Sequence, residues 1–310
     1  MENFLITITC LLAGVGLRRL PQMPQGGATV LNLVVINISL PALVLLKIPE
    51  LVFSREVLVP VIMPWVMLAA FALLTLLLTR VAGWSRPVTG CLLLLVPMGN
   101  TSFLGIPMVT AFFGEEGVPY ALLYDQLGSF LALSTYGALV LALYSGEGQV
   151  SARQVLGKIV RFPPFIALLI GLGMHLAGGA AAPLTWPSPL VALLDTLAAT
   201  LVPLVMLAVG WQMTLRLPRE LLSPLLGGLT LKMGVAPLVA LLGCLFLGLG
   251  GEPTRVAIFE AGMPPMISAG ALAMLAGLAP SLAAAMVGYG VLLAFITLPI
   301  LHWLIMLLGV

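Results

Sequence analysis

Ten apolar stretches, each of roughly 17 to 30 residues, constrain this chain more than any other feature, because a helix of that length crosses a lipid bilayer. The connections between them are short, such as Gly114-Glu115-Glu116-Gly117, and leave no room for a soluble domain. The sequence therefore predicts an all-α membrane protein with ten transmembrane helices. The stretches cover residues 3–19, 29–48, 57–80, 87–113, 118–144, 156–178, 189–213, 221–249, 253–277 and 281–308.

The composition excludes a soluble protein. Of 310 residues, 61% are apolar and 8% are charged, whereas an ordinary soluble domain has roughly 25% charged residues. The net charge of +2 is small and the basic residues form no stripe with aromatic residues, so no nucleic-acid partner is indicated. The N-terminus lacks a basic region and a cleavage site, so we expect the first apolar stretch to be retained. Cys10, Cys91 and Cys244 lie in apolar stretches and are interpreted as packing residues.

Lysine and arginine predict the orientation, because they resist translocation whereas Asp and Glu matter little. Nine of the 13 basic residues follow the first, third, fifth and seventh stretches, whereas the opposite side holds Lys47, Arg55 and Arg255. We therefore expect a multi-pass protein of the inner (plasma) membrane with both termini outside the cytoplasm. The nine residues are Arg18, Arg19, Arg80, Arg86, Arg153, Lys158, Arg161, Arg216 and Arg219.

The two halves of the chain resemble each other. The run Arg55–Pro60 recurs as Arg219–Pro224, and three further matches keep nearly the same offset of 162 to 166 residues. These matches pair Pro41 with Pro203, Pro87 with Pro253, and Thr135 with Thr297. Because five spans per half is an odd number, the second half must enter the membrane from the opposite face. We predict two inverted five-helix repeats, residues 1–148 and 149–310.

One apolar stretch in each half is interrupted at mid-membrane, in the fourth and ninth spans. Val96–Pro107 and Glu260–Gly270 contain glycines, prolines and polar residues that lipid does not tolerate unless they are buried or line a cavity. A pair of such broken helices is the best sequence pointer to a transporter's binding site, although a proline kink can also be purely structural. The predicted substrate-binding residues are Asn100, Thr101, Ser102, Pro107, Pro264, Pro265, Ser268, Lys232 and Asn37.

Charged residues inside the spans are costly, about 2.5 to 3.5 kcal/mol each at a helix centre on insertion scales. Lys232 lies near the middle of the eighth span, where it either neutralises an anionic substrate or pairs with a carboxylate. Asp125, Gln126 and Glu260 are candidates for carrying a proton or binding sodium. The alternative interpretation is that these carboxylates only hold Lys232 or line an outward vestibule.

The sequence lacks the motifs that other functional classes require. The chain contains no His-Glu-x-x-His, no Gly-x-Ser-x-Gly and no close pair of intramembrane aspartates, so an intramembrane enzyme is not indicated. A channel would need a continuous polar pore face, and the even spread of Leu and Ala argues against one. We predict a secondary transporter; the Lys232 ammonium would suit an anionic substrate, and a small organic anion is what the family resemblance described next implies. The alternative is a sodium- or proton-coupled symporter of a larger amphipathic anion, with Na+ or H+ as coupling ion and no other cofactor.

Several motifs resemble the auxin efflux carrier family of permeases along essentially the whole chain. They are Asn100–Pro107, then Phe113–Gly117 with Tyr120, then Met263-Pro264, Gly288-Tyr289-Gly290 and Thr297-Leu298-Pro299. The resemblance implies a fold related to the bile acid:sodium symporters, in which spans 1, 2, 6 and 7 form a scaffold that dimerises. Spans 3–5 and 8–10 would form a transport domain that moves as an elevator.

The resemblance also implies the substrates, which are mostly organic anions such as auxin in plants and proposed dicarboxylates in bacteria. By position, Asn100 matches the crossover asparagine that contacts the substrate carboxylate, and Pro107 and Pro264 match the crossover prolines. Ser102 departs from the family, because many bacterial relatives have glycine there. The run Pro264-Pro265-Met266 is poorer in polar side chains than a full sodium site would be.

Overall fold

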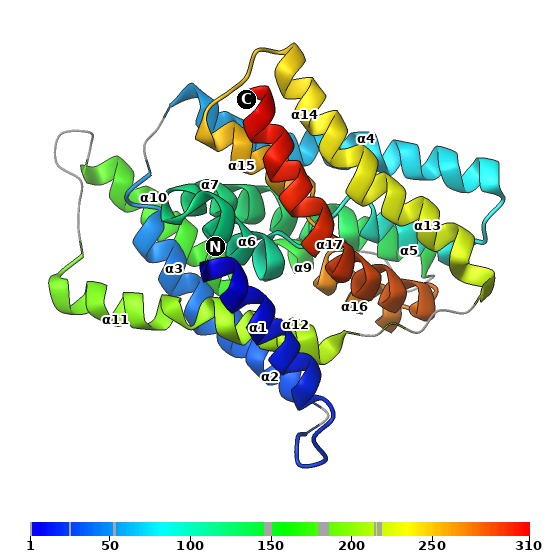
Figure 1. Cartoon of the computed structure of the whole chain (residues 1–310), viewed down its shortest axis with the longest axis horizontal. Helices are drawn as coiled ribbons and strands as arrows, with labels where there is room; N and C mark the ends of the chain where they lie inside the picture. The colour runs from blue at the N-terminus through cyan, green and yellow to red at the C-terminus, as the bar shows by residue number, and fades with distance from the viewer. Residues whose placement is uncertain are drawn as a thin grey trace. The chain divides into compact units, whose positions relative to one another are not determined.

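The computed structural model describes residues 2–24, 26–51, 54–145, 151–178, 186–213, 215 and 219–310 (Figure 1). Over these residues the chain is all-helical, and two residues that pair as an isolated β-bridge do not extend into a strand. The predicted boundary between the two halves, at residues 148 and 149, and the basic residue Arg216 lie outside the described residues.

Six helical stretches of the described chain are long and apolar enough to cross a membrane, and one bent pair of helices makes a seventh. The six are Gly27–Lys47, Arg55–Ala82, Glu115–Tyr144, Ser188–Gln212, Arg219–Phe246 and Pro280–Leu308, and the pair is Arg153–Val160 with Pro163–Ala177. They coincide with seven of the predicted spans, which confirms apolar helices there. Shorter helices occupy the first, fourth and ninth predicted spans.

Contacts within the chain divide it into two compact units. Unit 1 comprises Met1–Ser54, Ser102–Leu122 and Leu156–Met213, and unit 2 comprises Arg55–Thr101, Leu123–Val155 and Thr214–Val310. Unit 1 contains α1 (Glu2–Leu17), α2 (Gly27–Val34), α3 (Leu40–Lys47), α6 (Ile106–Phe113), most of α7 (Val118–Leu123), α10 (Pro163–Gly178), α11 (Ser188–Ala199) and α12 (Leu201–Gln212). Unit 2 contains α4 (Leu58–Ala82), α5 (Arg86–Leu95), α8 (Ala138–Tyr144), α13 (Leu222–Leu229), α14 (Ala236–Phe246), α15 (Glu252–Ala261), α16 (Ile267–Leu275) and α17 (Pro280–Leu308). The boundary at Leu156 divides α9 (Ala152–Val160).

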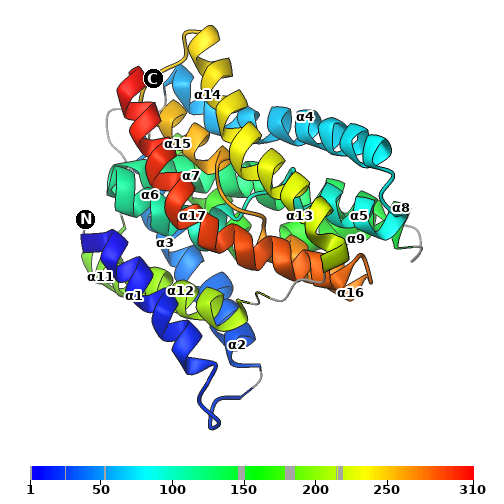
Figure 2. The ribbon, with the colours of Figure 1, turned by 45° about the vertical axis from the view of Figure 1, so that its right-hand side comes forward.

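Unit 1 is held by close helix packing. α1 lies beside α12 in both ribbon views (Figures 1 and 2), and each helix presents a glycine to the other. A Cβ at Gly14 would lie 2.2 Å from the Leu207 carbonyl oxygen, and one at Gly210 would lie 2.1 Å from that of Leu11. Small residues that allow such an approach are typical of helix pairs in membranes. α3 packs against α10 and α11, so the helices of the first, second, sixth and seventh predicted spans share this unit.

Unit 2 is organised around the long helices α4 and α17. α4 ends at Ala82 and is followed by Gly83, whose φ of 65° is left-handed. The Gly83 amide donates to the Arg80 carbonyl oxygen at 3.3 Å, an arrangement typical of a glycine that terminates a helix. Helices α5, α15 and α17 each have a proline in their first turn, where the missing N–H costs nothing. α17 packs against α16, α13 and α5. These contacts position the two short helices that flank the site described below.

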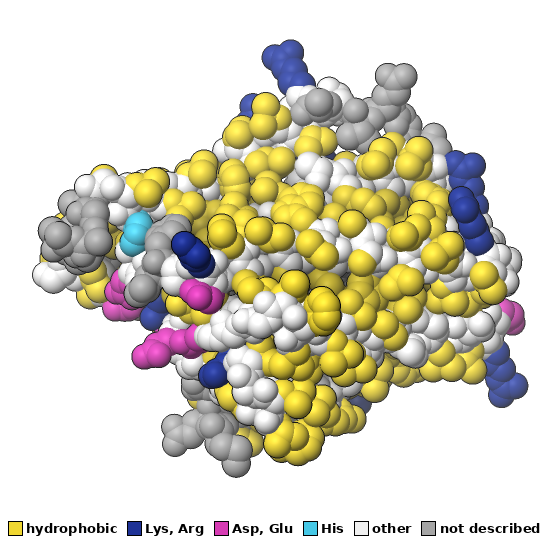
Figure 3. All heavy atoms as spheres, turned by 90° about the horizontal axis from the view of Figure 1, so that it is seen from above, with side chains coloured by type: hydrophobic (Ala, Val, Ile, Leu, Met, Phe, Trp, Pro, Cys, Tyr) yellow, Lys and Arg dark blue, Asp and Glu magenta, His cyan; other side chains and the backbone are white. Residues whose placement is uncertain are grey.

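The surface is suited to lipid. Hydrophobic side chains dominate the face seen in Figure 3, and charged side chains lie toward its margins. Val81, Phe246 and Leu275 are 88%, 90% and 84% exposed. Apolar surface on this scale is unusual for a soluble monomer and is expected where a bilayer replaces water.

Candidate functional site

Two non-helical segments face each other inside unit 2. α5 ends at Leu95 and the next helical residue is Thr101, whereas α15 ends at Ala261 and α16 begins at Ile267. Pro97, Pro264 and Pro265 have no amide N–H to donate, so neither segment can continue as a regular helix.

The two segments satisfy each other's backbone. The Asn100 amide donates to the Pro264 carbonyl oxygen at 2.8 Å, and the Met266 amide donates to that of Met98 at 3.2 Å. Gly99 and Pro265 form an antiparallel bridge between them. In a hydrocarbon environment freed backbone groups need such partners, so pairing explains how these interruptions persist. We call this pairing of residues 98–100 with 264–266 the crossing.

Six polar side chains are buried near the crossing or on the helices beside it. We call them the polar cluster, and each is at most 4% exposed. One carboxylate of the cluster is well held: the Thr101 hydroxyl donates to Asp125 Oδ1 at 2.5 Å, and Gln126 Nε2 donates to Asp125 Oδ2 at 2.7 Å. The cluster consists of Asn100, Thr101, Asp125, Gln126, Lys232 and Glu260.

Other members of the cluster lack partners. Among the described residues, both carboxylate oxygens of Glu260, the amide nitrogen Nδ2 of Asn100 and the amide oxygen Oε1 of Gln126 are buried without a hydrogen bond. A buried polar group left unsatisfied costs about 1–3 kcal/mol, and more if it is charged. Groups of this kind in one place indicate a site for a ligand, an ion, a proton or water.

Lys232 brings a positive charge to the crossing. Its ammonium donates to the carbonyl oxygen of Ala261, the last residue of α15, at 3.4 Å. It also lies beside Gly99, where an added Cβ would be 3.1 Å from Lys232 Nζ. Both Asp125 and Lys232 interact electrostatically with Glu260. With all three ionised, two carboxylates and one ammonium leave one negative charge in the cluster.

The helices that carry these side chains are locally widened. Thr101, Asp125 with Gln126, and Lys232 lie in the π-helical segments Thr101–Gly105, Tyr124–Phe130 and Thr230–Val235. Such segments are rare and occur frequently at functional sites. The cavity beside Gly99 has only about 10 Å³, room for about one water molecule. This cavity is therefore too small to hold an organic substrate in the conformation seen here.

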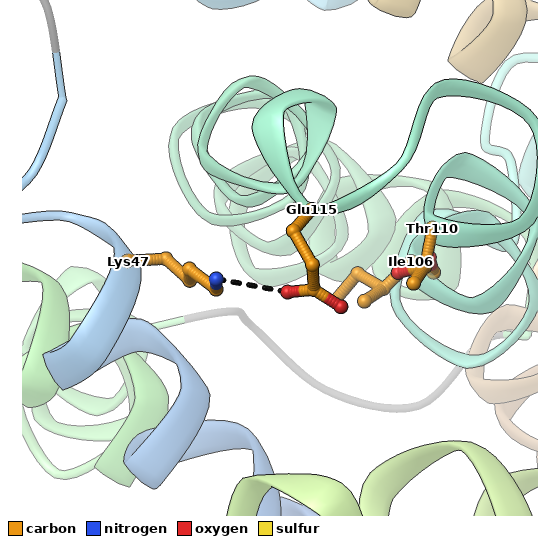
Figure 4. Close-up of polar contacts among 4 residues, drawn as sticks. All are labelled: Lys47, Ile106, Thr110 and Glu115. Carbon is orange, nitrogen blue, oxygen red and sulfur yellow. Dashed lines mark hydrogen bonds and ion pairs between the residues drawn. The ribbon is translucent and has the colours of Figure 1, made fainter. Parts of the chain in front are cut away.

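A larger cavity lies in unit 1. It has about 660 Å³ and is lined by apolar residues of α1, α3, α6, α11 and α12 together with a few polar ones. Lys47 from α3 and Glu115 from the turn after α6 point toward each other there and form an ion pair at 2.8 Å (Figure 4). Thr110, labelled in the same view, donates to the Ile106 carbonyl oxygen at 2.9 Å. The polar lining residues are Thr7, Lys47, Thr110, Glu115 and Asp195.

The structure groups most of the predicted site residues in unit 2. Asn100, Thr101, Asp125, Gln126, Lys232, Glu260, Pro264, Pro265 and Ser268 belong to it. Ser102, Pro107 and Asn37 belong to unit 1, where Pro107 lines the cavity and the Asn37 amide donates to the carbonyl oxygen of Leu33 in its own helix at 2.8 Å. Sequence reasoning missed Asp195, although a carboxylate inside the seventh predicted span was a usable signal. It used Lys47 only for orientation.

A helical, lipid-suited surface with a buried polar cluster defines a membrane transport protein. Residues 1–302 match the family described as membrane transport protein, and the chain belongs to this family, that of the auxin efflux carriers. Two archaeal proteins described as uncharacterized transporters are similar to it. One, from Methanothermobacter thermautotrophicus, is 28% identical over 303 residues, 96% of each chain. Another, from Methanocaldococcus jannaschii, is 27% identical over 271 residues, 85% of each chain. The protein is a transporter and not an enzyme.

Proposed function

We propose that this protein is a secondary transporter that carries a small organic anion, such as a carboxylate, by alternating access. Its ten spans would form two inverted five-helix repeats, with the fourth and ninth spans as the broken crossover helices. The observation that carries the proposal is the hydrogen-bonded crossing of residues 98–100 with 264–266, next to the buried side-chain nitrogen Nδ2 of Asn100, which has no hydrogen-bond partner among the described residues. Paired interruptions in two halves mark the substrate site of many transporters.

The chemistry of the crossing suits a carboxylate. The side-chain nitrogen Nδ2 of Asn100 is a free hydrogen-bond donor, and hydrogen bonds to charged groups are stronger than those between neutral groups. Lys232 supplies a positive charge, and α16 begins at Ile267 directly after Pro264 and Pro265, so that its positive end contributes as well. Ser268 lies in the first turn of this helix. The roles of Ser102, Pro107 and Asn37, which belong to unit 1, remain predictions from the sequence.

Coupling to an ion follows from the charge of the cluster. One negative charge remains when Asp125, Glu260 and Lys232 are ionised, and a buried uncompensated charge is costly. A proton on Glu260, or one Na+ held by Glu260 with Asp125 and the free oxygen of Gln126, would neutralise it. We propose that these three residues bind the coupling ion.

We further propose that transport is an elevator movement in a homodimer, with spans 3–5 and 8–10 moving past a dimerising scaffold of spans 1, 2, 6 and 7. The division of contacts supports a grouping of this kind. Unit 1 contains the helices of spans 1, 2, 6 and 7, and unit 2 contains those of spans 3, 8, 9 and 10 with most of span 5. The grouping differs from the proposal in residues 102–122, which belong to unit 1.

Uptake by the purified protein in liposomes tests the function. A panel of mono- and dicarboxylates would be offered with and without imposed Na+ and pH gradients. We expect saturable uptake of at least one carboxylate, and uptake at least tenfold weaker for Asn100→Ala. Failure of the whole panel, or an Asn100→Ala variant that transports like the original protein, would contradict the proposal.

The cavity in unit 1 favours a second candidate, a sodium- or proton-coupled symporter of a larger amphipathic anion. Its volume of about 660 Å³ lies within the roughly 300–1,000 Å³ of pockets that hold drug-sized ligands. Its walls are mainly apolar, and Lys47 offers a charge at one side. Competition separates the candidates: bulky amphipathic anions should displace a small carboxylate only if this second candidate is correct.

We also propose that the protein lies in the inner (plasma) membrane with both termini outside the cytoplasm. Cysteines introduced as Glu116→Cys and Gly157→Cys in a background without Cys10, Cys91 and Cys244 should react with impermeant reagents from opposite faces. Labelling of both from the same face would overturn the orientation.

A further inference from the structure

Lys232 has an unusual position for a buried lysine. Its side chain is inside unit 2, yet among the described residues its hydrogen bond goes to a backbone carbonyl, that of Ala261, and to neither nearby carboxylate. The Glu260 oxygens have no hydrogen-bond partner, although Glu260 interacts electrostatically with this ammonium. Lys232 therefore does not form an ordinary hydrogen-bonded ion pair.

The place that the ammonium occupies attracts cations. Ala261 ends α15, and the C-terminal carbonyls of a helix carry about half an elementary negative charge. Gly99, on the opposite segment of the crossing, has no side chain, and a Cβ there would lie 3.1 Å from Lys232 Nζ. The glycine thus leaves the space that the ammonium uses. In broken-helix transporters, helix C-termini and free carbonyls of this kind coordinate Na+ or H+.

We propose that the Lys232 ammonium is a covalently attached cation that occupies the crossing in place of a diffusible monovalent ion. The crossing then always has a positive charge at the end of α15, whether or not a coupling ion is bound by Glu260, Asp125 and Gln126. The inference rests on the proposed function, because it assigns a role within the same site. It gives Lys232 an electrostatic and positioning role, and it predicts that any small cation able to reach the crossing can replace the side chain.

Removal of the side chain tests this directly. Lys232→Ala takes away the charge and leaves a space for Na+ or a small alkylammonium ion. Thermal unfolding of the purified protein would be followed while NaCl or ethylammonium chloride replaces choline chloride at constant ionic strength. We expect the unfolding temperature of Lys232→Ala to rise by about 1–2 °C when the small cation reaches about five times its dissociation constant. The original protein, whose crossing already holds the Lys232 ammonium, should not respond to ethylammonium, and a response of it to Na+ alone would report the proposed coupling site.

Two variants serve as controls. Lys158→Ala removes an exposed lysine of α9 and should behave like the original protein. Lys232→Arg keeps the charge, so it should also show no response to added ethylammonium. An ethylammonium response of Lys158→Ala equal to that of Lys232→Ala would point to a general ion effect and overturn the proposal.

Other outcomes are equally decisive. A saturable stabilisation of the original protein by ethylammonium would show that the crossing still takes up a diffusible cation in place of the ammonium and would overturn the proposal, as would a Lys232→Ala variant that folds but ignores both cations. If Lys232→Ala cannot be purified, the titration of the original protein with ethylammonium chloride decides alone. This readout needs no substrate, so a failure of carboxylate uptake would refute the proposed function without touching the cation result.

Discussion

Units 1 and 2 each contain a neighbouring lysine and glutamate, in opposite surroundings. In unit 1, Lys47 and Glu115 form an ion pair at 2.8 Å with side chains that are 21% and 62% exposed. In unit 2, Lys232 and Glu260 are 4% and 0% exposed, and the Glu260 oxygens have no hydrogen-bond partner among the described residues. The buried pair thus interacts electrostatically but lacks the hydrogen-bonded contact that the more exposed pair has.

This difference separates two kinds of charge in a membrane protein. An exposed ion pair contributes about 0–1 kcal/mol, because water already solvates both groups. Removing an ion from water costs several kcal/mol unless its partners offset this desolvation penalty. The pair in unit 1 can therefore be lost at little cost, whereas the polar cluster in unit 2 is difficult to explain by stability. We expect substitutions in the two units to differ in both size and kind of effect.

The largest expected effect is that of Glu260→Gln. The variant should lose ion-driven accumulation of substrate entirely, because it removes the group that is free to take up the coupling ion. Its unfolding temperature should stay equal or rise, since a buried charge without a hydrogen bond is replaced by a neutral amide. Uptake driven by Na+ or pH gradients and thermal unfolding measure the two quantities. Glu116→Gln, at an exposed glutamate, is the matched control, and accumulation retained in Glu260→Gln would remove Glu260 from coupling.

The second-largest effect is expected for Asn100→Ala, on substrate binding. Loss of one hydrogen bond to a charged group costs about 1.5–3 kcal/mol, so substrate binding should weaken about 10- to 150-fold. Folding should be unaffected, because the Asn100 Nδ2 has no partner to lose and the backbone bond to Pro264 remains. Isothermal titration with the transported carboxylate gives the affinity. Asn32→Ala, which removes a buried amide oxygen without a partner in α2, should leave binding unchanged, and unaltered affinity in Asn100→Ala would place the substrate elsewhere.

Lys232→Met should weaken anion binding by about tenfold or more, since a unit charge near the anion is lost in a medium of low dielectric constant. The free energy of unfolding, measured by thermal unfolding, should change by less than the free energy of anion binding. The reason is that the ammonium makes a single long hydrogen bond of 3.4 Å. Lys158→Met is the control at an exposed lysine. The reverse result, a large loss of thermal stability with normal affinity, would make Lys232 a structural residue.

The smallest effect is expected for Glu115→Gln. It breaks the ion pair with Lys47, and because such pairs contribute at most about 1 kcal/mol, transport should change less than about fivefold. The effect should shrink further in high salt, which screens exposed charges. Initial uptake rates at low and high ionic strength provide the measurement. A loss of tenfold or more would mean that the cavity in unit 1, and not only the crossing, takes part in transport.

Much of the helical framework could be predicted from hydrophobicity. Apolar runs such as 57–80 and 281–308 correspond to the uninterrupted helices α4 and α17, because a long hydrophobic segment has few alternatives to a helix in a membrane. Prolines at 97, 264 and 265 likewise indicated where helical hydrogen bonds fail. These are local properties of the chain, so a single sequence contains them.

The contacts that make the site could be predicted less well from the sequence. That Thr101 donates to Asp125, and that Lys232 reaches Ala261 beside Gly99, depends on how distant segments pack. The π-helical turns that carry these residues have no clear sequence signature, since one extra residue per turn is decided by packing and by local hydrogen bonds. Lys47, Glu115 and Asp195 were missed as cavity residues for the same reason.

The mutual approach of α1 and α12 has a mechanical consequence. Where Gly14 and Gly210 touch the opposing backbone, neither helix can slide or rotate without its main chain colliding with its neighbour. The two helices should therefore respond to lateral pressure from the bilayer as one rigid body, with no lipid entering between them. One added methyl group at either glycine would collide with the opposing backbone and force the two helices apart.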